Sequence, residues 1–159
     1  MKKSSKGFSL IELLIVVAII LIIAAIAIPN LLRSRIAANQ ASAVGSLRTL
    51  NTAEITYSST YNVGFTATLS YLGPTTSTNP TSTAAGLIDS VLALGSKSGY
   101  SFAYTPGPTD TTGRINTYFF TAVPITTSTG TNYYYTDQSG VIRQNSTTTA
   151  GSTDSPIAG

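Results

Sequence analysis

The chain has 159 residues, enough for one domain of ordinary size and an additional element. Only 9% of the residues are charged, far below the usual quarter, and neither Cys nor His occurs. The sequence therefore excludes disulfides and lacks the commonest general base and the commonest metal ligand, which argues against an enzyme.

The formal net charge of +3 comes from the N-terminus. Lys2, Lys3 and Lys6 are three of the nine basic residues, and the remaining six are balanced by six acidic residues. The rest of the chain has no basic patch, so we expect no specific nucleic-acid site.

Residues 8–28 are apolar except for Ser9 and Glu12. As a helix they would span about 31 Å, which is enough to cross the hydrocarbon core of a bilayer. The many Ile and Val residues are compatible with a helix there, because in lipid the backbone must form its hydrogen bonds within its own segment. The sequence therefore predicts a transmembrane helix over residues 8–28.

A second helical stretch follows Pro29. Because proline lacks an amide donor and crowds the preceding turn, we expect a helix kink or local melting over residues 26–30. Residues 29–60 are predicted to be the outer half of the same long, bent helix. Its apolar positions form one amphipathic stripe, at Ile36, Ala43, Leu47, Leu50 and Tyr57.

Residues 61–159 are predicted to form a globular head. Residues 62–85 are rich in Ser, Thr and Pro, as in loops, and residues 87–94 fit one or two helical turns. Alternating or aromatic stretches then predict strands at residues 100–105, 117–123, 133–136 and 141–144, with a hairpin turn at residues 137–140. The expected fold class is α+β, with a long bent N-terminal helix packed on an antiparallel sheet of three or four strands.

Glu12 is the unusual residue of the apolar stretch. A carboxylate at the centre of a membrane costs about 2.5–3.5 kcal/mol on insertion scales, and less near the interface. An uncleaved signal anchor would explain the three lysines and the apolar run, but it would leave Glu12 and the Gly7-Phe8 junction without a role.

The basic leader, Gly7, Phe8, Glu12, the apolar run and Pro29 together resemble the N-terminus of the type IV pilin and pseudopilin superfamily. The resemblance covers residues 1 to about 57. It implies that a prepilin peptidase cuts after Gly7, removing residues 1–7, and that Phe8 becomes N-methylated. It also implies that Glu12 serves assembly by pairing with the Phe8 amine of a neighbouring subunit.

The partners implied by this resemblance are copies of the chain in a helical filament, the prepilin peptidase and an inner-membrane assembly platform. The implied locations are the bacterial inner membrane for the precursor and an extracellular pilus for the assembled chain. Adhesion, motility and DNA uptake all stay open as outputs of such a filament.

Three functions remain in competition. They are a structural subunit of a type IV pilus, a pseudopilin of a type II secretion or DNA-uptake system, and a monomeric membrane-anchored binding module. Major secretion pseudopilins usually carry an Asp-Pro-Trp-Gly segment before the sheet, whereas this chain has no Trp and reads GSKSG at residues 95–99. That favours the pilus, although many pilins close their C-terminal region with a disulfide, which this chain cannot form.

Calcium is the one metal that the remaining acids suggest, since Asp89, Asp110, Asp137 and Asp154 could include oxygen ligands. The four are widely spaced, and Asp137 is well explained as a turn residue. We therefore expect no metal and no cofactor. The clustered Tyr and Phe residues of the predicted strands are expected to form the sheet core.

Overall fold

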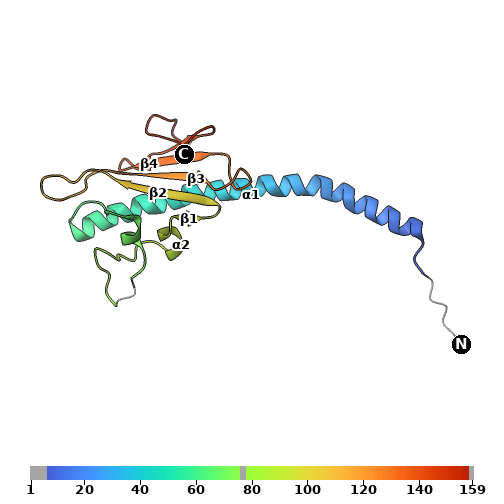
Figure 1. Cartoon of the computed structure of the whole chain (residues 1–159), viewed down its shortest axis with the longest axis horizontal. Coiled ribbons are helices and arrows are strands. Elements are labelled where there is room, and N and C mark those ends of the chain that lie inside the picture. The colour runs from blue at the N-terminus through green and yellow to red at the C-terminus, as the bar shows by residue number, and fades with distance from the viewer. Residues whose placement is uncertain (1–6, 76–77, 158–159) are drawn as a thin grey trace. The chain divides into compact units, whose positions relative to one another are not determined.

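The computed structural model describes residues 7–75 and 78–157 and divides into two units, which meet between Arg35 and Ile36. The lysines of the predicted leader lie outside the described residues. Figure 1 shows the elements in chain order. They are α1 (Leu10–Tyr61), the 3-10 helix η1 (Leu69–Leu72), α2 (Ser90–Ala93), β1 (Ser96–Lys97), β2 (Tyr100–Pro106), β3 (Tyr118–Pro124), β4 (Tyr133–Asp137) and β5 (Ile142–Asn145).

α1 is one helix of 52 residues with Pro29 inside it. The local melting that we expected over residues 26–30 is absent, so that part of the prediction is wrong. Proline removes only the amide that would bond the carbonyl of Ala25, and the apolar residues on both sides continue the helix. A kink at Pro29 stays a prediction.

Part of α1 lies in the unit that begins at Ile36 and supplies one face of that unit's core. Four of the five residues of the predicted stripe are buried, and Ile36 is half-buried. The helix ends at Tyr61, and the next residue, Asn62, adopts a left-handed conformation with φ 55°. Asparagine is one of the few residues that tolerate this conformation directly after a helix.

The sheet is an antiparallel meander in the order β1-β2-β3-β4-β5. All four predicted strands are present, and each of their ends lies within one residue of the position expected. The fifth strand, β1, has only two residues, too few to show an alternating pattern, and this is why we expected three or four strands. The turn between β4 and β5 forms as predicted, since the Gly140 amide donates to the Asp137 carbonyl over 2.9 Å.

The core of the head lies between α1 and the inner face of the sheet. Side chains alternate along β3, where Tyr118, Phe120 and Ala122 are buried. The rings of Tyr104 and Phe120, which face each other across β2 and β3, have centroids 4.8 Å apart. The prediction that the aromatic residues build the sheet core is therefore confirmed.

Candidate functional site: the N-terminal assembly segment

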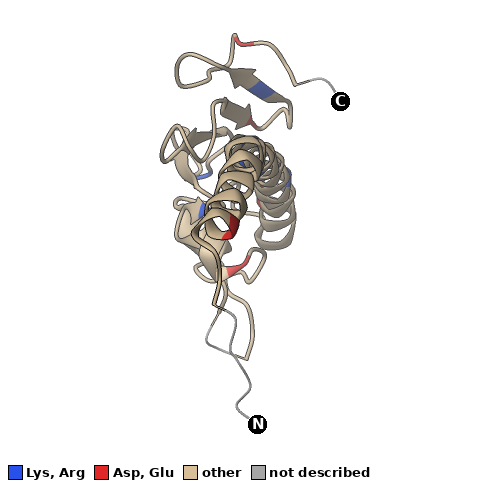
Figure 2. Cartoon of the chain, turned by 90° about the vertical axis from the view of Figure 1, so that its right-hand side faces the viewer, with Lys and Arg blue, Asp and Glu red and all other residues tan. Residues whose placement is uncertain are grey.

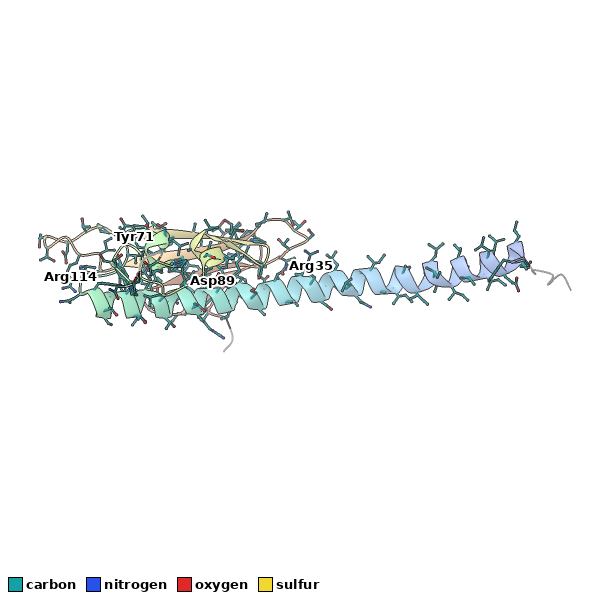
Figure 3. All side chains as sticks on the ribbon, turned by 90° about the horizontal axis from the view of Figure 1, so that it is seen from below. Arg35, Tyr71, Asp89 and Arg114 are labelled. Carbon is teal, nitrogen blue, oxygen red and sulfur yellow. The ribbon has the colours of Figure 1, made fainter. Side chains whose placement is uncertain are left out.

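The first part of α1 exposes nearly all of its apolar side chains. Phe8 is 84% exposed and Leu31 is 72% exposed, and between them only Ala24 is as much as half-buried. Figure 3 shows these side chains projecting from the ribbon on every side. This stretch is long and apolar enough to cross a membrane. Because such a surface is unfavourable in water, lipid or other protein chains must cover it.

Glu12 lies in the first turn of α1, where it caps the helix. Its Oε2 accepts a hydrogen bond from the backbone amide of Ser9 over 2.9 Å. This is half of a capping box, in which the acidic side chain three residues into the helix satisfies the amide of the capping residue. The signal was present in the sequence as Ser9-x-x-Glu12, and we had not recognised it.

The cap uses one carboxylate oxygen of Glu12. The other, Oε1, accepts no hydrogen bond from the residues that the structure describes. A carboxylate near the start of a helix is also favoured by the helix dipole. Glu12 is therefore held in place locally and still has an oxygen with which to bind a cation from outside the chain.

Gly7 has no structural reason to be glycine in this chain. A Cβ atom at this position would meet nothing within 4 Å, and the residue is not in a left-handed conformation. Gly7 and Phe8 are both exposed, so the bond between them is accessible. The requirement for glycine, if there is one, must come from another molecule that binds this junction.

The head contains a buried polar group that the sequence analysis missed. Glu54 of α1 is fully buried, and both of its carboxylate oxygens bind Thr66. The Thr66 amide donates to Oε2 over 3.0 Å, and the Thr66 hydroxyl donates to Oε1 over 2.5 Å. Burial raises the pKa of the Glu54 carboxyl above its ordinary value, and the hydrogen bonds from Thr66 oppose that rise.

A second buried polar group lies one helical turn earlier. Asn51 donates from Nδ2 to the hydroxyl of Thr136 over 2.8 Å and accepts from the hydroxyl of Tyr118 over 3.1 Å. Asn51 and Glu54 were easy to overlook because polar residues in an amphipathic helix normally face water. Their one signal is that they directly follow Leu50 and Ala53 on the buried stripe.

The four aspartates that suggested a calcium site do not form one cluster. Asp89 caps α2 and forms an ion pair with Lys97, with 2.8 Å between Oδ2 and Nζ. Asp110 accepts hydrogen bonds from Thr112, Arg114 and Asn116 in its own loop, which hold the pKa of its carboxyl well below the usual range. Within residues 7–75 and 78–157, no three His, Cys, Asp or Glu side chains gather at a possible metal site.

Comparison with known proteins finds a match to one family model and two relatives among type IV pilus proteins. Residues 2–28 match the family model described as the prokaryotic N-terminal methylation motif. The chain is 65% identical over 37 residues to a type IV wide pilus major component, PilA4, of Thermus thermophilus, and 52% identical over 50 residues to a type IV major pilin protein, PilA, of Myxococcus xanthus.

These alignments are short. They cover 23% and 31% of this chain, and 28% and 23% of the length of the two relatives respectively. No solved structure matches the chain. The family-model match spans the Gly7-Phe8 junction and the apolar stretch up to Ile28, and the two relatives show that the chain is similar to type IV pilins over a short length.

Proposed function

We propose that the chain is a structural subunit of a type IV pilus. A prepilin peptidase removes residues 1–7 from an inner-membrane precursor and methylates the new amino group of Phe8. Residues 8–28 then leave the membrane and pack with the same segment of other copies. Residues 29–60 form the outer half of the helix, and residues 61–159 form the head. The observation that carries the proposal is the exposed apolar part of α1, which directly follows the Gly7-Phe8 junction and has Glu12 in its first turn.

The hydrophobic effect by itself does not drive this transfer. Burying an exposed Leu, Ile or Val contributes about 1.5–3 kcal/mol when it leaves water, but these side chains are already in lipid, which is as apolar as a helix bundle. Moving from lipid to a filament core therefore changes their free energy little. The group with most to gain is Glu12, whose carboxylate is poorly solvated in lipid and can find a cation in the filament.

The cation is the amino group of Phe8 on a neighbouring copy. Cleavage after Gly7 creates this charge, so an uncleaved chain cannot provide it. Within one helix, the Glu12 Oε2 atom is already bound by the Ser9 amide. Its Oε1 atom is the oxygen that pairs with the neighbour, which would set the axial position of each subunit relative to the next.

The proposal is supported by the two relatives, both of which are named as major components of type IV pili. These names favour the pilus over a secretion pseudopilin and over a monomeric anchored module. The assembly platform in the inner membrane is a further partner that the proposal requires.

A deletion strain complemented with Glu12 variants tests the proposal. Deletion should remove surface filaments and leave the secretion of folded exoproteins intact, and the wild-type gene should restore the filaments. Glu12→Ala and Glu12→Gln should both be inserted and cleaved but should give at least about tenfold fewer filaments, as expected for the loss of a poorly solvated ion pair.

The glutamine variant separates the two roles of Glu12. Its amide oxygen still accepts from the Ser9 amide, so it keeps the helix cap and loses only the charge. Normal filament yield from Glu12→Gln would show that the cap suffices and would refute the ion pair. Deletion that abolishes secretion of exoproteins and leaves surface filaments would reassign the chain to a secretion system.

A further inference from the structure

The Glu54 carboxyl lies where α1 meets the segment that follows it, residues 62–72. Thr66 is fully buried and is held at three points. Its amide and hydroxyl bind Glu54, and its carbonyl accepts from the Tyr104 hydroxyl over 2.6 Å. The same segment brings Phe65 against the core and Leu72 into it. Glu54 is thus the side chain of α1 that binds Thr66 in this segment, which also forms backbone hydrogen bonds to Ile115 and within residues 85–88.

The groups around Glu54 are neutral. They are Tyr57 of α1, Tyr104 of β2 and Tyr118 of β3, whose hydroxyls stay protonated below pH of about 10. Within the described part of the chain, the one ion pair joins Lys97 and Asp89. A negative charge on Glu54 is consequently buried without a compensating cation, which is the costly way to bury a charge.

We propose that Glu54 is a proton-operated latch, which in its protonated form holds residues 62–72 on α1 and on ionisation loosens them. A protonated carboxyl can accept the Thr66 amide at one oxygen and form one hydrogen bond with the Thr66 hydroxyl at the other, and it buries no charge. Ionisation keeps both acceptors but leaves the charge uncompensated.

The sign of the pH dependence follows from the direction of the pKa shift. The pKa of Glu54 is raised above its ordinary value of 4.5, chiefly by burial. Its contribution to stability is therefore complete below pH 4.5 and is lost as pH rises through the raised pKa of the folded state. For each pH unit by which the Glu54 pKa of the folded state exceeds that of the unfolded state, the folding equilibrium constant falls about tenfold as pH rises through that range.

Hydrogen exchange of the full mature chain in detergent micelles tests the latch. Exchange of peptides covering residues 62–72 is measured by mass spectrometry from pH 4 to 9 and corrected for the intrinsic rate. In the wild type, protection of this segment should fall as pH rises. In Glu54→Gln, a neutral side chain whose oxygen can accept from the Thr66 amide and whose NH2 group can donate to the Thr66 hydroxyl, protection should not depend on pH.

Two further variants sharpen the test. Thr66→Val removes a hydroxyl that favours the ionised form, so the fall in protection should move to higher pH. Asp137→Asn removes a carboxylate in the β4–β5 turn and should leave the wild-type profile unchanged. The latch is refuted by a flat wild-type profile or by a Glu54→Gln profile that matches the wild type. If Glu54→Gln does not fold, the direction of the shift in Thr66→Val decides the question, because a profile that does not move upward also refutes it.

Discussion

At the scale of single residues, no contact within the described part of the chain requires glycine at position 7. A side chain at this position would meet no atom of the protein within 4 Å. We propose that glycine is required here by a prepilin peptidase, which would bind the Gly7-Phe8 bond in an extended conformation with little room for a side chain.

This explanation predicts that Gly7→Ala leaves insertion and folding unchanged and lowers cleavage at least about tenfold, a modest loss of binding energy in transition-state terms. The ratio of precursor to mature chain in isolated membranes measures the effect. Ser9→Ala is a suitable control, because the hydrogen bond from Ser9 to Glu12 uses the backbone amide and should survive. Cleavage of Gly7→Ala at the wild-type rate would show that the glycine is not read by the enzyme.

Residues differ in how far their roles can be predicted from sequence. Glu12 was evident because a carboxylate inside an apolar stretch is energetically unusual wherever the helix lies. Glu54 was not evident because its burial depends on where residues 62–72 return to the helix. That contact is a tertiary one, and nothing in the pattern around Glu54 encodes it.

At the scale of elements, α1 and the turn that follows it contain two glycines with opposite roles. Gly45 lies within the helix, and a Cβ there would meet nothing within 4 Å. Gly64 has φ +87°, and a Cβ there would lie 2.4 Å from the carbonyl oxygen of Ile115. Gly45 is thus a replaceable helix residue, whereas Gly64 is needed for the close approach of two backbones.

We expect Gly45→Ala to stabilise the head by about 0.5–1 kcal/mol, because alanine loses less backbone entropy in a helix. Gly64→Ala should destabilise it by about 2 kcal/mol or more, since strain in the left-handed region adds to the clash with Ile115. Thermal unfolding of the full chain in detergent measures both changes. A stabilising Gly64→Ala, or a strongly destabilising Gly45→Ala, would contradict these assignments.

The elements themselves were largely predictable, for identifiable reasons. The four longer strands show alternating or aromatic patterns that a half-buried strand imposes on its sequence. β1 shows none because its two residues pair only with the start of β2. The continuity of α1 through Pro29 was not predictable from the proline alone, because one missing hydrogen bond can be tolerated when both flanks favour helix.

At the scale of the whole molecule, the chain is nearly uncharged outside its leader. Figure 2 shows Lys, Arg, Asp and Glu as a few scattered positions on the ribbon. With residues 1–7 removed, six basic and six acidic side chains remain. Such a neutral surface, rich in Ser and Thr, allows identical heads to pack closely in a filament without mutual repulsion.

The N-terminus of the subunit in the assembled state is the most direct test of the proposed function. Intact-mass spectrometry of sheared surface filaments measures this. We expect a subunit that begins at Phe8 and carries about 14 Da of additional mass from a methyl group on its amine, consistent with removal of a processed segment. Filament subunits that retain residues 1–7 would contradict it, because an uncleaved chain has no Phe8 amine with which Glu12 of a neighbour can pair.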